Sequence, residues 1–161
     1  MVYPHGLKQF DHMWYLVAWD PQKKGIRTFG LDRIQDFEVT EHVFKRQENF
    51  SMEKYFEHYY GIWGGDEQYD GPVVIRLLST AKYANYLKAI PLHHTQKIVE
   101  EDEFECLFEL RLTPSWDFTQ KLMTMADQVQ GVSPESLRDE LVEALEYGIG
   151  YQNCVDEDDE Y

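Results

Sequence analysis

A run of seven consecutive apolar residues, Met13 to Trp19, constrains the fold of this chain more than any other feature. Asp11-His12 and Asp20-Pro21 bound the run, which is rich in aromatic residues and much shorter than the roughly 20 residues that cross a membrane as a helix. We therefore predict a strand at the centre of a sheet, buried on both faces.

The residues that follow predict a hairpin and a tight turn. Residues 20–25, Asp-Pro-Gln-Lys-Lys-Gly, supply turn-forming side chains, and residues 26–29 resume an alternating pattern. Residues 31–34 have no period of two, so we expect a tight helical turn there, before a further strand over residues 37–44. This order suits a small SH3-like β-barrel.

Three motifs carry a resemblance to a known family. Trp14-Tyr15-Leu16 lies in the apolar run, an Arg-x-Phe-x-Leu-Asp-Arg-Ile string occupies residues 27–34, and residues 3–7 contain a Pro-x-Gly-Leu segment. In this order they resemble the WYL domain. The resemblance implies an SH3/Sm-like barrel over residues 1–49 that senses a ligand in bacterial transcriptional regulators, commonly behind a winged helix-turn-helix DNA reader, which is not seen here.

The same resemblance predicts a barrel that is truncated at its start. A WYL barrel normally begins some strands before the Pro-x-Gly-Leu segment, whereas Met1 stands directly against it, so either the barrel is truncated or its start is misassigned. A partial barrel exposes a strand edge, and the sheet of the second half offers another. We therefore expect the chain to form a homodimer.

Residues 50–72 are expected to link two domains. Apolar residues between 52 and 60 follow the spacing of an amphipathic helix, with Ser51 as its N-cap. From Gly61 to Pro72 glycines and polar residues end all periodicity. The domain boundary is therefore placed in this segment.

Residues 73–150 predict a ferredoxin-like module. We expect strands over 73–78, 96–99, 105–112 and 127–130, and helices over 80–89, 113–125 and from Ser133-Pro134 to Tyr147. The order β-α-β-β-α-β with a terminal helix indicates this α+β architecture. Residues 92–96 and 133–138 also resemble the WCX extension that follows many WYL domains.

Charge is distributed unevenly along the chain. The net charge is −15, yet residues 1–49 carry seven basic and seven acidic side chains, so the deficit lies in the remainder and in the acidic tail, residues 151–161. Because phosphate affinity comes from lysine and arginine, this chain alone is not expected to bind duplex DNA.

Candidate ligand contacts lie in the first domain. Arg27 and Arg33 either bind phosphate or form ion pairs with Asp32 or Asp36, and the resemblance implies that such basic residues hold the ligand. His5, expected on a turn, is either exposed or a ligand contact. Trp14 and Leu16 are expected in the core, and Tyr15 on the opposite face suits either role. A further set of basic residues is expected to be solvated turn charges: Lys8, Lys23 and Lys24.

No catalytic or metal-binding pattern emerges. His93 and His94 are adjacent, so they are expected to point to opposite sides of an extended segment. Cys106 is expected to be an inert buried thiol, and the carboxylates of residues 100–103 to form a solvated turn. We therefore predict no enzyme activity, no metal and no cofactor.

The sequence also bears on the cellular location. The chain has no membrane-spanning stretch and too few cysteines for a disulfide framework, which favours the cytoplasm.

Two functions follow from these observations. In the first, the chain is the ligand-sensing region of a bacterial transcriptional regulator and binds single-stranded nucleic acid or a nucleotide. Arginines would pair with phosphates while Tyr15 and His5 stack on bases or hydrogen-bond to the ligand. In the second, the chain is a dimerisation or protein-docking scaffold with no small ligand. A basic concavity lined by Arg27 and Arg33 would favour the first function, and paired, buried arginines that face carboxylates would favour the second.

Overall fold

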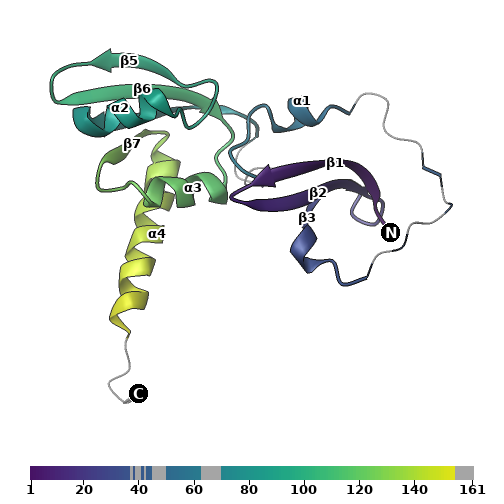
Figure 1. The fold of residues 1–161 in the computed structure, drawn as a ribbon. Helices are drawn as coiled ribbons and strands as arrows, with labels where there is room; N and C mark the ends of the chain where they lie inside the picture. Colours follow the sequence, from purple (N-terminus) through teal and green to yellow (C-terminus); the bar gives the residue numbers. More distant parts are fainter. Residues whose placement is uncertain (37, 39–40, 42, 45–49, 63–69, 155–161) are drawn as a thin grey trace. The chain divides into compact units, whose positions relative to one another are not determined.

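The computed structural model describes residues 1–36, 38, 41, 43–44, 50–62 and 70–154. In this part of the chain the fold is mixed α/β, with two antiparallel sheets and four α-helices (Figure 1). The chain divides into two compact units, residues 1–64 and residues 65–161.

The first unit is built on a three-stranded antiparallel sheet. Its strands are β1 (Tyr3–Phe10), β2 (Met13–Asp20) and β3 (Gly25–Gly30), in the order β1-β2-β3. The apolar run therefore forms the central strand, as predicted. Strand β1 had no prediction from the pattern of apolar residues.

Two tight turns connect these strands. Asp11 and His12 have φ angles of 46° and 64°, the positive values that a two-residue hairpin loop requires to match the twist of the sheet. The predicted hairpin between β2 and β3 is confirmed. Its turn is held by the Asp20 carboxylate, which accepts hydrogen bonds from the backbone N–H groups of Gln22 and Lys23 at 2.8 and 3.2 Å.

The prediction that β2 is buried on both faces is wrong. Only Val17 and Ala18 of this strand are fully buried, whereas Trp14 is 48% exposed and Met13 is 39% exposed. Side chains of a strand alternate between faces, so Trp14 and Ala18 share one face, and Val17 lies on the other. At its first residues the strand has no covering layer among the described residues.

A short helix and several aromatic rings pack against β1. Helix α1 (Met52–Phe56) is shorter than the helix predicted over residues 52–60, but Ser51 is its N-cap, as predicted, and accepts a hydrogen bond from the Lys54 N–H at 3.3 Å. Gly6 of β1 lies against Met52, because a Cβ atom there would be 3.1 Å from the Met52 side chain.

The tight helical turn that was expected over residues 31–34 is the 3₁₀ helix η1 (Leu31–Arg33).

The described part of the first unit is an open sheet, so the SH3/Sm-like barrel is not established. The strand predicted over residues 37–44 lies largely outside the described residues. No strand is found among those of its residues that are described.

The second unit has a four-stranded antiparallel sheet in the order β5-β6-β4-β7. Its strands are β4 (Val73–Thr80), β5 (Lys97–Glu101), β6 (Glu105–Leu112) and β7 (Val129–Ser133). The alternation predicted for β6 is confirmed, because one face of this strand is buried: Cys106, Phe108, Leu110 and Leu112.

Three helices accompany this sheet. Helix α2 (Ala81–Ala89) ends before Pro91, as predicted, and packs against β4 and β6. Helix α3 (Trp116–Met123) begins after its N-cap Ser115, later than the predicted Thr113-Pro114, because the Ser115 hydroxyl accepts from the Phe118 N–H.

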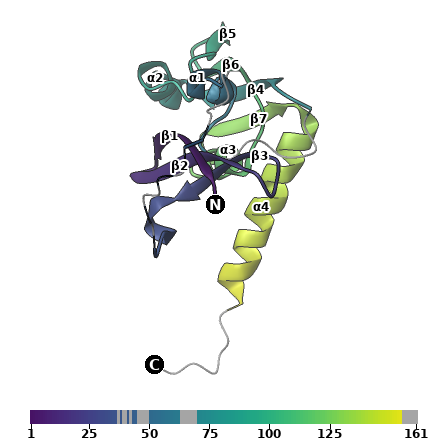
Figure 2. The same ribbon diagram turned by 90° about the vertical axis from the view of Figure 1, so that its right-hand side faces the viewer.

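Helix α4 (Glu135–Asn153) is longer than the prediction and packs against β7 and α3 (Figures 1 and 2). Pro134, rather than Ser133, is its N-cap, and its side chain makes no capping hydrogen bond. The helix continues six residues beyond the predicted end at Tyr147, so part of the predicted acidic tail is helical.

Candidate functional site

Arg27 lies near the start of β3, opposite Ala18 of the central strand. Its side chain is exposed, and no ion pair to it is found within the described residues. Its positive charge acts on the Tyr55 phenol. The pKa of this phenol is raised, because burial and Tyr59 raise it by more than Arg27 lowers it. An exposed guanidinium in this position can donate N–H hydrogen bonds to an anion.

Arg33 lies on η1, directly after β3. Its Nε is 3.8 Å from a carboxylate oxygen of Asp32, and the Arg33 side chain is 86% exposed. An exposed pair at this distance contributes on the order of 0–1 kcal/mol, so the contact with Asp32 leaves Arg33 able to bind another anion. Among the described side chains, Asp36 makes no ion pair with it.

The structure does not bring all four candidate residues together. Tyr15 is half-buried and lies opposite Lys8 and Gly30, whereas Arg27 lies opposite Ala18. Tyr15 and Ala18 are three residues apart on one strand, so Tyr15 and Arg27 project from opposite faces, about 10 Å apart along the sheet. One small ligand would not contact both side chains on the same surface.

His5 lies in strand β1, and not on a turn as predicted. The register of β1 against β2 shifts between Pro4 and Gly6, so His5 occupies a β-bulge. Its Nδ1 is 2.9 Å from the Tyr3 carbonyl oxygen, and its ring packs edge-on against Phe50, with the centroids 4.6 Å apart. Its Nε2 is buried and has no hydrogen-bond partner in the part of the chain that the structure describes.

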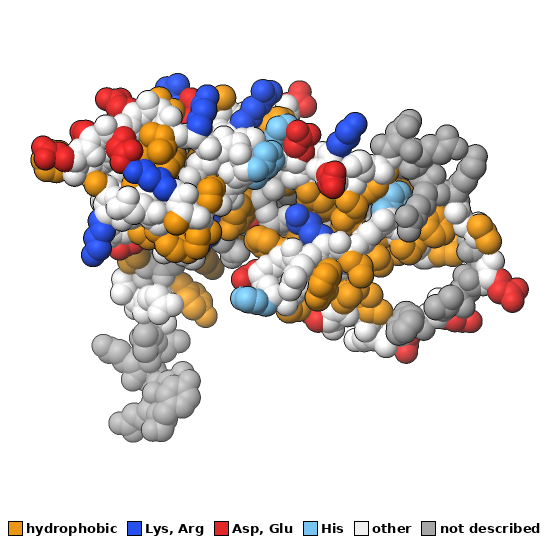
Figure 3. All heavy atoms as spheres, turned by 45° about the horizontal axis from the view of Figure 1, so that its top comes forward, with side chains coloured by type: hydrophobic (Ala, Val, Ile, Leu, Met, Phe, Trp, Pro, Cys, Tyr) orange, Lys and Arg blue, Asp and Glu red, His pale blue; other side chains and the backbone are white. Residues whose placement is uncertain are grey.

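Trp14 is a candidate ligand contact that the sequence interpretation placed in the core. It is 48% exposed and shares its face of the sheet with Leu16 and with the positions opposite them, among them Leu7, which is 55% exposed. In the space-filling view, hydrophobic side chains reach the surface of this unit, with scattered basic side chains among them (Figure 3). Trp14 would be a core residue only if other residues covered its face of the sheet. The sequence alone does not show whether that face is covered.

Lys8 also differs from its prediction as a solvated turn charge. It lies in β1 with its Nζ 4.2 Å from the centroid of the Phe56 ring, and burial lowers the pKa of its ammonium group. Lys23 and Lys24 are exposed in the β2–β3 turn, as predicted.

The histidines and the cysteine considered for catalytic chemistry have structural surroundings. The rings of His93 and His94 lie 4.1 Å apart in a turn, so the prediction that they point to opposite sides is wrong. His93 Nδ1 is 2.8 Å from the Thr95 hydroxyl. Cys106 is buried, and this burial raises the pKa of its thiol, which disfavours the reactive thiolate.

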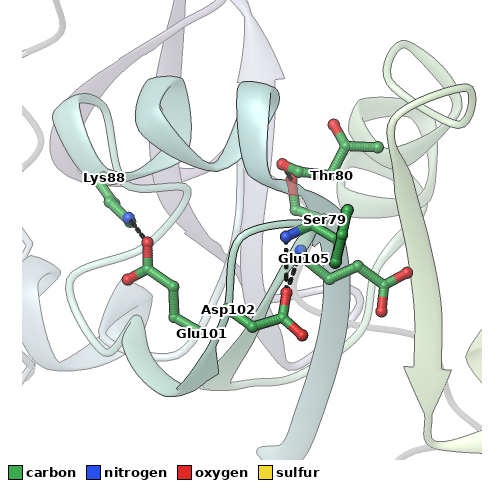
Figure 4. Close-up of polar contacts among 7 residues, drawn as sticks. Ser79, Thr80, Lys88, Glu101, Asp102 and Glu105 are labelled. Atoms are coloured by element: carbon green, nitrogen blue, oxygen red, sulfur yellow. Dashed lines mark hydrogen bonds and ion pairs between the residues drawn. The ribbon is translucent and has the colours of Figure 1, made fainter.

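The carboxylates of residues 100–103 are divided between a strand and a turn. Glu101 is the last residue of β5 and forms an ion pair with Lys88 of α2 (Figure 4). The Asp102 carboxylate accepts hydrogen bonds from the N–H groups of Phe104 and Glu105, both at 2.8 Å, and these bonds lower its pKa. These acids hold a turn and do not form a general acid and base pair.

Neither a metal site nor a membrane span is found in the described residues. No group of three or more histidine, cysteine, aspartate or glutamate side chains is placed to hold a metal ion there. None of the described helices combines the length and the apolar character needed to cross a bilayer.

Comparison with known proteins finds two domain families in this chain. Residues 1–39 match the model of the WYL domain, and residues 70–147 match the model of the WCX domain. None of the curated proteins matches the chain.

Several solved structures resemble this chain, and one of them covers most of its length. It is proteasome accessory factor B/C (PafBC) of Arthrobacter aurescens, which is 22% identical, with a TM-score of 0.36. The match covers 87% of this chain and 20% of that protein, so the chain spans about one fifth of its length. The family matches therefore carry the identification: the chain contains a WYL domain segment followed by a WCX domain.

Proposed function

We propose that this chain is the ligand-sensing region of a bacterial transcriptional regulator, and that its WYL segment binds single-stranded nucleic acid or a related nucleotide. The carrying observation is that Arg27 and Arg33 are exposed and that no buried carboxylate faces either of them in the described residues. A purely structural role would favour buried, paired arginines, because exposed ion pairs contribute little to stability.

The spacing of the two arginines favours an extended ligand. Arg27 and Gly30 are separated by about 10 Å along β3, and Arg33 lies one 3₁₀ turn further on. A single-stranded nucleic acid carries several phosphates in a row. It can therefore contact both guanidinium groups even though the two side chains do not lie close together. We therefore favour a short oligonucleotide over a mononucleotide.

Trp14 supplies a surface on which a base can stack. It shares one face of the sheet with Arg27, and base stacking on an exposed aromatic ring contributes about 1–3 kcal/mol per base. Tyr15 and His5 lie elsewhere: Tyr15 on the opposite face and His5 in the β1 bulge with its buried Nε2. In this proposal Tyr15 and His5 lie outside the surface that Trp14 and Arg27 form.

The strand order of the second unit supports its assignment as a ferredoxin-like module. In chain order its strands form the arrangement second-third-first-fourth, all antiparallel, with a helix after the first and after the third. In this proposal the module has no ligand site of its own, and it acts as the structural extension of the WYL segment.

The test is direct binding of a fluorescein-labelled single-stranded oligonucleotide, measured by anisotropy at two salt concentrations. Arg27→Ala and Arg33→Ala should each weaken binding. Each should also reduce the log–log slope of affinity against salt by roughly 0.7 for every phosphate that the variant no longer neutralises. Arg→Lys at either position should restore only part of the affinity, because lysine keeps the charge but does not have the planar fork of donors.

Lys82→Ala is the matched control, because Lys82 is an exposed basic residue on α2 of the other unit. Duplex DNA of the same sequence should bind more weakly than the single strand, since the chain carries a net charge of −15. The scaffold function predicts the reverse result: no oligonucleotide binding by the wild type, and a lower melting temperature in the arginine variants.

A further inference from the structure

Three neighbouring positions lie in a line across the sheet of the first unit. Lys8 of β1 is opposite Tyr15 of β2, and Tyr15 is opposite Gly30 of β3. Residues directly opposite each other on adjacent strands project from the same face, with their Cβ atoms about 5 Å apart. The line therefore lies on one face of the sheet, on the side away from Trp14 and Arg27, and its two ends are about 10 Å apart.

The β3 end of this line has no side chain of its own, and Arg33 occupies the space. A Cβ atom on Gly30 would meet the Asp32 carboxylate and would lie 3.8 Å from Arg33 Nε. Because that Cβ atom would point to the face of Tyr15, the side chains of η1 are folded back over this face, and η1 packs against β2. We call Lys8, Tyr15 and Arg33 the cross-sheet row.

The ammonium group at the β1 end of the row has no anionic partner in the described part of the chain. Its Nζ lies 4.2 Å from the centroid of the Phe56 ring, and burial lowers the pKa of Lys8. No ion pair to Lys8 is found among the described carboxylates. A partly buried charge is normally paired, because burial removes part of its hydration. The ring contacts one side of the ammonium group, so its N–H donors can still bind an anion.

We propose that Lys8 is a further cationic contact for the nucleic-acid ligand, and that the ligand crosses the sheet along the cross-sheet row, from Arg33 over Tyr15 to Lys8. This inference rests on the proposed function and adds to it a contact residue and a direction for the strand. Two cations that bind phosphate, with an aromatic ring between them on which a base can stack, fit a single strand that carries several phosphates.

The same geometry identifies one group that opposes binding. The Asp32 carboxylate lies over Gly30, and it is 3.8 Å from Arg33 Nε. Its negative charge repels a phosphate at this end of the row. Removing the charge of Lys8 and removing that of Asp32 should therefore change the affinity for a single strand in opposite directions.

The experiment measures binding of a fluorescein-labelled single-stranded oligodeoxyadenylate to the full chain by anisotropy, over a range of salt concentrations. Lys8→Met should weaken binding about tenfold at low salt and reduce the log–log slope against salt by roughly 0.7, because one phosphate contact is lost. Lys8→Arg keeps the charge and should retain most of the affinity and the slope.

Tyr15→Leu separates stacking from charge. It should weaken binding but leave the slope against salt unchanged, because stacking of a base on a ring neutralises no phosphate. A slope that falls equally in Tyr15→Leu and in Lys8→Met would contradict the separate roles of the two residues.

Matched controls come from α1 of the same unit. Lys54→Met removes an exposed positive charge outside the row and should weaken binding far less than Lys8→Met. Asp32→Asn should strengthen binding, and it should do so more than Glu53→Gln, which removes an exposed negative charge from α1. Thermal unfolding of each variant establishes that it remains folded.

The outcomes separate this inference from the proposed function. If Arg27→Ala weakens binding while Lys8→Met behaves like Lys54→Met, the row is overturned and the proposed function stands. A wild type that binds no oligonucleotide overturns both. If Lys8→Met does not fold, the variants of Asp32 decide, because the Asp32 side chain is 46% exposed. An affinity that Asp32→Asn does not raise above that of Glu53→Gln overturns the row.

Discussion

Lys8 of β1 lies over the ring of Phe56 on α1, with its Nζ 4.2 Å from the ring centroid. This cation–π contact joins the sheet of the first unit to its only α-helix in the described residues. It also places an ammonium group where burial opposes its charge, and the pKa of Lys8 is lowered accordingly. The cation–π contact stabilises the fold, whereas the burial of the ammonium group makes the stability depend on pH. The two effects can be measured separately.

The first prediction concerns the pH dependence of stability at Lys8. With its folded pKa below the unfolded value of 10.5, the unfolded chain binds more protons between the two values, so stability rises with pH in that window. Lys8→Met has no such titration. The free energy of unfolding of the wild type, minus that of Lys8→Met, should therefore increase as the pH approaches about 10.5.

Denaturant unfolding at several alkaline pH values provides the measurement. Lys23→Met, in the exposed β2–β3 turn, controls for the removal of one positive charge. A difference between wild type and Lys8→Met that stays constant or decreases with pH would contradict the burial of this ammonium group.

The second prediction contrasts two glycines. Gly6→Val should destabilise the first unit by about 1–3 kcal/mol, because its Cβ would already lie 3.1 Å from the Cγ and Sδ atoms of Met52. Gly148→Ala should stabilise α4 by about 0.5–1 kcal/mol, since no described atom lies within 4 Å of the added Cβ. Denaturant unfolding of both variants should give changes of opposite sign, and equal signs would refute the packing of α1 on β1.

The sequence predicted the parts of the fold in which one face of a strand is buried. In β6 the buried residues from Cys106 to Leu112 alternate with exposed ones, so the period of two is visible in the sequence. Strand β1 was missed because the bulge at His5 interrupts its alternation, and because Asp11-His12 lacks the glycine or asparagine typical of a two-residue hairpin.

The candidate site was predicted less well, for a different reason. An apolar run indicates a strand but does not show whether both faces are covered, so Trp14 was placed in the core although it is 48% exposed. Contacts between distant segments, such as Lys8 with Phe56 and His5 with Phe50, leave no local pattern. The exposure of Arg27 likewise depends on neighbours that only the folded sheet supplies.

The third prediction concerns the two cysteines. Cys106 is buried, and that burial raises its pKa, so the thiolate that reacts with alkylating reagents is disfavoured. Cys154 is exposed at the end of α4. Iodoacetamide applied to the folded chain should modify Cys154 alone, and denaturant should expose Cys106. Peptide mass spectrometry locates the modification, and labelling of Cys106 at a comparable rate in the folded chain would exclude a stably packed second unit.

The last prediction concerns Glu109, which lies between two basic residues in a row across the second sheet. The Glu109 carboxylate accepts hydrogen bonds from Lys97 Nζ at 2.8 Å and Arg76 Nε at 3.2 Å, and these partners lower its pKa from 4.5. A carboxylate with a lowered folded pKa stabilises the fold at pH values above its unfolded pKa. This stabilisation disappears as the pH falls through the folded value.

Glu109→Gln should therefore be less stable than the wild type at neutral pH, and the difference should shrink as the pH falls below about 4.5. The expected cause is local, because Arg76 and Lys97 each pair with Glu109 in the strand register. Glu103→Gln, in the exposed turn after β5, is the control for removing one negative charge from an acidic chain. Thermal unfolding from pH 7 to pH 3 measures both variants. If Glu109→Gln and Glu103→Gln follow the same course with pH, the row of charges on the sheet does not contribute to its acid stability.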